Sequence, residues 1–222
     1  MMRLLLLLTI LLLTNCSAKD YIISFSTPYG KMDAILYDKT PEHKALFIQE
    51  IKKGTFENTS CTKLNPQFIL TIGKTPQPLS SFTKIAPTCK DEILPEYDST
   101  LFHRKGSLGA FTLSSGKSTI GCEFYITEGR KFSKEELDLI EAKTHKKIST
   151  LYRNEYQTTG GIPYLDQENT LFGEIIKGIS IIDQLQHEPS NEFGKPNRNL
   201  PIKISIKKIT KKRITKEYSY IY

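Results

Sequence analysis

The chain has no tryptophan and only four histidines and four cysteines in 222 residues. The histidines, His43, His103, His145 and His187, are scattered, and the cysteines form neither a CxxC pair nor a zinc-type spacing. Metal centres need several such ligands at short spacings, so neither a metal nor another cofactor is expected. No internal repeat indicates a solenoid. The longest apolar run, Leu4–Leu13, is broken only by Thr9 and is shorter than the ~20 residues with which a helix crosses a bilayer.

What the chain does contain is enough apolar material for a core. Hydrophobic residues make up 38% and aromatic residues 10% of the sequence, which argues against disorder. The net charge is +7, and its lysines are spread along the chain until they gather near the C-terminus. Because no nucleic-acid motif accompanies them, we interpret these lysines as a solvated surface and expect no nucleic-acid partner.

The N-terminal segment resembles a bacterial lipoprotein signal. Met1-Met2-Arg3 is a short basic start, the apolar run follows, and Leu13-Thr14-Asn15-Cys16 has the form of a lipobox. We expect residues 1–15 to be removed, Cys16 to be diacylated, and residues 16–20 to tether a membrane-anchored lipoprotein, in the outer membrane and facing the periplasm or the cell surface. An ordinary signal peptide with an incidental cysteine is the alternative.

Cys61, Cys89 and Cys122 leave at least one cysteine unpaired. A disulfide is allowed outside the cytoplasm, but each of the three also suits the role of a small buried hydrophobe. Their pairing stays open.

Short strands dominate the predicted elements. Alternating polarity and turn residues predict strands over 21–27, 31–38, 60–64, 68–72, 106–112, 122–127 and 170–176, the first two as a hairpin. Ile202, Ile204 and Ile206 alternate with polar residues and predict a half-buried edge strand. Residues 74–100 are predicted to be mainly loop.

Helices are predicted at three places. Thr40 is the expected N-cap of a helix that starts at Pro41 and ends at Gly54. Ser133 and Glu136 form a capping box for a helical insertion over about 132–157, with apolar contacts from Leu137, Ile140, Ile148 and Leu151. Gly178–Leu185 is a short helix, and 211–222 is a basic, tyrosine-rich tail. This inventory favours a small β-barrel or sandwich with helical caps.

Function enters through an ordered set of segments between about Tyr21 and Thr210. They include Phe56 to Gly73, Phe102-His103-Arg104-Lys105-Gly106, Glu123-Phe124-Tyr125-Ile126-Thr127 and Thr170-Leu171-Phe172-Gly173-Glu174. Together they resemble the cyclophilin family of peptidyl-prolyl isomerases, and the insertion resembles one in cyclophilin-like lipoproteins of the Bacteroidetes. The resemblance implies a mainly β fold, a closed eight-stranded antiparallel barrel with capping helices, and proline-containing polypeptides as partners.

The resemblance also implies site residues. The catalytic positions, which hold Arg and Gln in the family, are Lys63 and Thr71 here. The proline socket is formed by Phe68, Ile69, Tyr125 and Leu165. Further substrate-binding positions are Phe111, Glu123, Tyr164 and Asn169, where family members carry Ala, Gln, Trp and His.

Two functions follow from this pattern. One is a peptidyl-prolyl isomerase and folding factor for exported proteins. Its catalysis would be weak, because Lys63 lacks the planar guanidinium group of an arginine and Thr71 is too short to replace a glutamine. The other is a catalytically degenerate cyclophilin that serves as a binding subunit of an outer-membrane protein complex. In that case the insertion and the tyrosine-rich tail are partner contacts.

Overall fold

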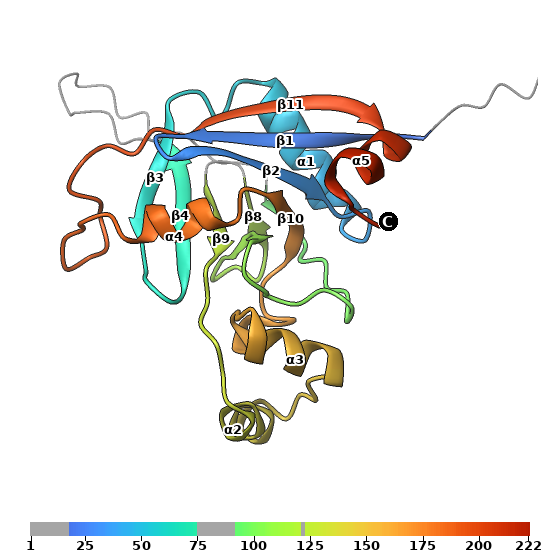
Figure 1. The fold of residues 1–222 in the computed structure, drawn as a ribbon, viewed down its shortest axis with the longest axis vertical. Helices are drawn as coiled ribbons and strands as arrows, with labels where there is room; N and C mark the ends of the chain where they lie inside the picture. Colours follow the sequence, from blue (N-terminus) through green and yellow to red (C-terminus); the bar gives the residue numbers. More distant parts are fainter. Residues whose placement is uncertain (1–17, 75–91, 121–122) are drawn as a thin grey trace, which may run out of the picture.

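The computed structural model describes residues 18–74, 92–120 and 123–222 (Figure 1). Its largest sheet is antiparallel and contains β1 (Lys19–Thr27), β2 (Gly30–Leu36), β3 (Thr59–Leu64), β4 (Ile69–Lys74), β6 (Ser107–Gly109), β9 (Glu123–Thr127), β10 (Leu171–Lys177) and β11 (Lys203–Thr210). The strand order is β11-β1-β2-β10-β6-β9-β4-β3. The predicted hairpin of the first two strands is confirmed, with Thr27 opposite Gly30 at its turn.

The eight strands form an open half-barrel, so the predicted closure of the barrel is wrong. Within the described residues, the edge strands β3 and β11 share no ladder, and an isolated bridge between Ser60 and Pro201 is the only pairing between these two edges. The backbone bonds Cys61 N to Leu200 O and Ile202 N to Thr59 O flank this bridge at 2.9 Å each. Because proline has no backbone N–H, Pro201 cannot extend these contacts into a regular ladder.

The inner face of the sheet is filled by aromatic rings. Phe47 of α1 (Pro41–Lys52) contacts Phe56, Phe124 and Phe172 at centroid distances of 5.2, 5.1 and 5.0 Å. Edge-to-face pairs of this kind stabilise a core beyond the area that they bury. The predicted start of α1 at Pro41 is confirmed, but Thr40 makes no side-chain cap because its buried hydroxyl has no partner in the described residues.

The predicted strand over 106–112 is split between two sheets. β6 ends at Gly109, and Phe111–Thr112 form β7 in a small sheet with β8 (Ser118–Thr119) and β5 (Glu92–Ile93). Between them the Ala110 N–H donates to Thr170 O at 2.9 Å, next to the pairing of Gly109 with Leu171, and the main sheet ends there. The predicted loop over 74–100 lies largely outside the described residues.

The insertion forms two helices, α2 (Lys134–Thr144) and α3 (Thr150–Thr158), which extend below the sheet (Figure 1). The capping box of Ser133 and Glu136 is confirmed. His145 adopts a left-handed φ of 56°, and this ends α2. The predicted packing of Leu151 is wrong, since this side chain is 64% exposed at the start of α3.

After β10, the chain forms α4 (Ser180–Gln186), β11 and a helix that the sequence did not predict, α5 (Lys211–Tyr218). The Thr210 hydroxyl accepts from Arg213 N and caps α5, while Ile214 packs with Ile22, Ile35 and Ile209 on the outer face of the sheet. None of the helices in the described residues has the length and apolarity to cross a bilayer.

Candidate functional site

The two predicted catalytic positions, Lys63 and Thr71, belong to a row of paired residues that crosses four neighbouring strands. Lys63 of β3 is opposite Thr71 of β4, and Thr71 is opposite Tyr125 of β9. Gly109 of β6 then faces Tyr125. Residues directly opposite each other in an antiparallel sheet share a face, so these side chains border one patch of surface. Lys63 is exposed in this patch and forms no ion pair with the described residues, whereas Thr71 is buried.

The predicted socket residues gather beside this row. Ile69 and Tyr125 are buried in one cluster, and Phe68, Phe111 and Leu165 pack against it half-buried. Tyr164 stacks on Phe68 with 6.3 Å between the ring centroids and is 44% exposed. We call these six residues the socket cluster. The structure thus brings together residues that are up to 97 positions apart in the sequence.

Ile162 also belongs to the buried part of the cluster, and the sequence did not single it out. It precedes the short 3-10 helix Pro163–Leu165, which carries Tyr164 and Leu165. An apolar residue between the Gly160-Gly161 pair and a proline was the only signal available.

A buried chain of hydrogen bonds, also not predicted, holds the Tyr125 hydroxyl. His103 Nε2 lies 2.9 Å from this hydroxyl, and His103 Nδ1 lies 2.9 Å from Asp166 Oδ1. A carboxylate can only accept, so Nδ1 carries the proton, and in the neutral imidazole Nε2 then accepts from Tyr125. Tyr156 of α3 donates to the other Asp166 oxygen at 2.5 Å. The helical insertion is therefore linked to the socket cluster through polar contacts.

Tyr125 is fully buried, and burial raises the pKa of its hydroxyl well above the ordinary value. The Asn169 side chain also hydrogen-bonds this hydroxyl. Asn169 thus contacts the buried aromatic residue of the cluster, and its role as a substrate-binding position stays a prediction.

Glu123 lies at the start of β9, two residues before Tyr125, and is exposed. Its carboxylate accepts from the Thr62 hydroxyl at 3.2 Å. Glu123 therefore borders the row of Lys63 and Thr71 but is not part of the socket cluster.

Phe111 covers the inner part of the cluster. Its ring centroid lies 5.1 Å from that of Tyr125, and the Tyr125 side chain has no exposed surface. The half-buried or exposed members of the cluster are Phe68, Phe111, Tyr164 and Leu165, and Lys63 is exposed at the end of the adjoining row. Such a surface can pack against a small apolar ring and offer one cation to a polar group.

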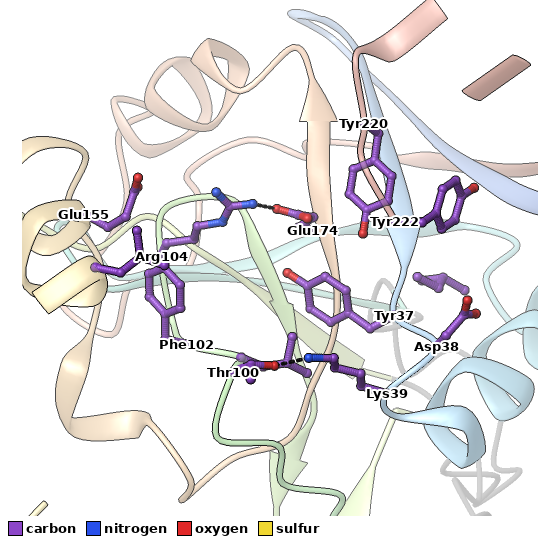
Figure 2. A pocket seen from close by; sticks show the side chains of 13 residues that line it. Tyr37, Asp38, Lys39, Thr100, Phe102, Arg104, Glu155, Glu174, Tyr220 and Tyr222 are labelled. Atoms are coloured by element: carbon purple, nitrogen blue, oxygen red, sulfur yellow. Dashed lines mark hydrogen bonds and ion pairs between the residues drawn. The ribbon is translucent and has the colours of Figure 1, made fainter. Parts of the chain in front are cut away.

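A separate cavity of about 410 Å³ lies between α3, the end of β2 and the C-terminal tail (Figure 2). Arg104 forms an ion pair with the buried Glu174 and also lies near Glu155, while Tyr37, Tyr220 and Tyr222 stand around it. None of the socket residues lines this cavity.

The other predicted groups have mixed outcomes. Cys61 is a free, buried thiol, and burial raises its pKa to about 12, so it is protonated at neutral pH. Cys16, Cys89 and Cys122 lie outside the described residues. Within the described part of the chain, no three His, Cys, Asp or Glu side chains are arranged to hold a metal ion.

The protein is thus a mainly β, antiparallel half-barrel with helical caps, and it carries an apolar cluster next to a row that ends in Lys63. Residues 22–208 match the family profile described as cyclophilin type peptidyl-prolyl cis-trans isomerase/CLD. The chain therefore belongs to the cyclophilin-type peptidyl-prolyl cis-trans isomerase family.

Curated relatives carry the same description at low identity. A putative peptidyl-prolyl cis-trans isomerase of Staphylococcus saprophyticus is 22% identical over 85% of this chain and 92% of the relative. A putative bifunctional phosphatase/peptidyl-prolyl cis-trans isomerase of Streptococcus pyogenes is 22% identical over 81% of this chain. The match spans only 37% of that longer protein.

Solved structures show the same fold. A cyclophilin type peptidyl-prolyl cis-trans isomerase of Cryptosporidium parvum superposes with a TM-score of 0.59 at 20% identity, over 85% of this chain and 98% of the other. The same parasite protein in the presence of the dipeptide Ala-Pro superposes with a TM-score of 0.57 at 21% identity, over 83% and 96% of the two chains.

Proposed function

We propose that this protein binds X–Pro segments of exported polypeptides on the open part of the socket cluster and catalyses their cis–trans isomerisation weakly. The observation that carries the proposal is the placement of Lys63 and Thr71 in one row with Tyr125, beside Phe68 and Leu165. An X–Pro bond rotates slowly because amide resonance opposes the twist, with a barrier of ~20 kcal/mol. Lowering it needs an apolar hold on the proline ring and a fixed donor near the twisted amide.

Lys63 is the only residue of the row that can donate as a cation. Its ammonium is a point charge on a flexible stem, so it is less preorganised than a guanidinium fork. The loop at Gly194 passes close to this stem: Gly194 O accepts from Leu64 N at 2.7 Å, and a Cβ added at residue 194 would stand 3.2 Å from Lys63 Cγ. Each missing fixed donor costs roughly 10²–10³ in rate, by analogy with oxyanion sites. Binding is therefore supported more strongly than fast turnover.

A proline-peptide isomerisation assay on the fragment that starts at Ala18, which contains every described element, tests this proposal. We expect a slow but measurable acceleration that disappears in Lys63→Ala and increases in Lys63→Arg. Lys212→Ala, which removes an exposed lysine of α5 on the outer face of the sheet, is the matched control. Acceleration that persists unchanged in Lys63→Ala contradicts the role of Lys63. If neither the unmodified fragment nor Lys63→Arg accelerates the isomerisation, the proposed isomerase activity is contradicted.

The second candidate function is that of a binding subunit in an outer-membrane protein complex. Two observations favour it: Phe111 covers the Tyr125 ring, and the cavity in Figure 2 lies between the insertion and the tyrosine-rich tail. Co-purification from membranes discriminates the two functions. A stable partner that is lost in Leu151→Asp, at the edge of this cavity, together with an inactive fragment, would favour the binding subunit.

We also propose that the protein is exported and anchored to a membrane by lipid on Cys16. The lipobox form of Leu13-Thr14-Asn15-Cys16 supports this proposal. Replacing Cys16 by serine should release the protein from the membrane fraction, and labelled palmitate should no longer be incorporated. Retention of Cys16→Ser in washed membranes contradicts a lipid anchor at this residue.

A further inference from the structure

The positive charge of this protein is concentrated in one segment. Residues 203–217 contain seven lysines and arginines and one glutamate, a net charge of +6 out of +7 for the whole chain. The segment comprises β11, which is an edge strand, and α5, which follows it directly. The charge therefore belongs to two adjacent elements on one side of the sheet (Figure 1).

Successive side chains of β11 point to opposite faces of the sheet, and this directs two of these lysines outward. Ile204 and Ile206 pack against the core, so Lys203, Ser205 and Lys207 point to the outer face, on which Ile209 meets α5. Lys203 and Lys207 are both exposed and are about 13 Å apart along an extended strand.

α5 adds two more lysines. Ile214 and Tyr218 face the sheet, which leaves Lys212 and Lys216, at a spacing of one helical turn, exposed to solvent. Within the described residues, Lys203, Lys207, Lys212 and Lys216 form no ion pair, whereas the neighbouring Arg213 is neutralised by Glu217 and Lys211 by Asp38. We call these four lysines the basic face.

The basic face lies where the N-terminal segment joins the fold. Lys19 is opposite Thr210 at the end of β11, and the Lys211 N–H donates to Ala18 O at 2.7 Å. The residue two positions before Ala18 is Cys16, and the apolar run Leu4–Leu13 precedes it. Any membrane attachment through this segment would bring the bilayer next to α5, so lipid phosphates are a closer match to this surface than a nucleic acid.

We propose that the basic face docks on a bilayer that contains anionic phospholipid and holds the domain against the membrane surface. A polybasic patch is a recognised signal for attachment to anionic membranes, and beside an acylated Cys16 it would fix which side of the domain faces the bilayer. Lysines near an anionic surface are attracted to it, and the attraction decays over a Debye length of ~8 Å at physiological salt. The docking does not depend on the isomerase activity proposed above.

Vesicle sedimentation of the unlipidated fragment from Ala18 tests this inference. We expect binding to phosphatidylcholine vesicles that contain phosphatidylglycerol, weakening as salt rises, and no binding to pure phosphatidylcholine. The quadruple variant K203Q/K207Q/K212Q/K216Q should bind at least about tenfold more weakly. The matched control K117Q/K134Q/K143Q/K195Q removes the same charge from exposed lysines elsewhere and should bind like the unmodified fragment.

Equal weakening in the two quadruple variants overturns the inference, because it shows a response to net charge alone. Equal binding to both vesicle types, or to neither, overturns it as well. The same fragment is measured against duplex DNA and polyglutamate. If K203Q/K207Q/K212Q/K216Q loses affinity for either polymer and not for the vesicles, the basic face serves a polyanionic partner other than lipid. Both quadruple variants should unfold at the same temperature as the unmodified fragment, which shows that the substitutions change surface charge and not the fold.

Discussion

The ring of Tyr125 lies directly over Gly109 in the neighbouring strand. A Cβ at residue 109 would stand 2.0 Å from Tyr125 Cζ and 2.3 Å from its hydroxyl oxygen. Gly109 is therefore the residue that makes room for a buried tyrosine in the socket cluster, and the His103 bond then fixes the hydroxyl end of the ring.

Replacing Gly109 by alanine should destabilise the protein by about 1–3 kcal/mol, because overpacking forces a held ring out of its place. Chemical denaturation measures this cost. In a Tyr125→Ala background the same Gly109→Ala change should cost clearly less, since the obstructing ring is gone. Gly116→Ala is the control, because no atom lies within 4 Å of its added Cβ and only its φ of 74° opposes the change. Equal costs of Gly109→Ala in both backgrounds contradict the steric account.

Removing the Tyr125 hydroxyl should cost about 1–3 kcal/mol, because Tyr125→Phe leaves His103 Nε2 buried without a partner. Tyr156→Phe should cost less, since Asp166 is partly exposed and water can reach its free oxygen. The two changes should couple in a double-mutant cycle by more than about 0.5 kcal/mol if the hydrogen-bond chain acts as a unit. Tyr97→Phe, which loses an exposed bond to Glu168 O, is the control. If the free-energy costs of Tyr125→Phe and Tyr156→Phe simply add in the double variant, the hydrogen-bond chain does not act as a unit.

The sequence indicated the strands and socket members because these depend on local alternation and on an ordered resemblance. It did not indicate the chain of His103, Asp166 and Tyr156, because Asp166 lies 63 residues from His103 and no periodic pattern relates the two. α5 was missed because Ile214 is its only fully buried residue, so its apolar stripe is too narrow to recognise among lysines. Leu151 was misjudged because an isolated leucine on a short helix carries no information about which face the insertion presents.

Acidification should destabilise the protein through His43. Burial lowers the pKa of this imidazole below 6.5 against the opposing effect of Glu96 and Glu42, and Nε2 has no partner among the described residues. The unfolded chain then binds the proton more readily, so the stability due to a neutral His43 is present above the unfolded pKa and is lost as pH falls through it. Unfolding free energies measured from pH ~7.5 to ~5 should decline less in His43→Gln than in the unmodified chain. His145→Gln, at an exposed histidine, is the matched control.

Phe111→Ala should convert the covered socket into an open one. The half-buried ring of Phe111 packs on Tyr125, so its removal exposes an aromatic floor against which a proline ring can pack. We expect the variant to bind an X–Pro peptide about fivefold more tightly, equivalent to ~1 kcal/mol of additional apolar contact, at some cost in stability. Titration calorimetry with a proline peptide and its alanine analogue measures the gain, and Leu139→Ala, at an exposed leucine of α2, is the control. If Phe111→Ala binds the proline peptide no better than the unmodified chain, Phe111 is part of the binding surface and does not obstruct it.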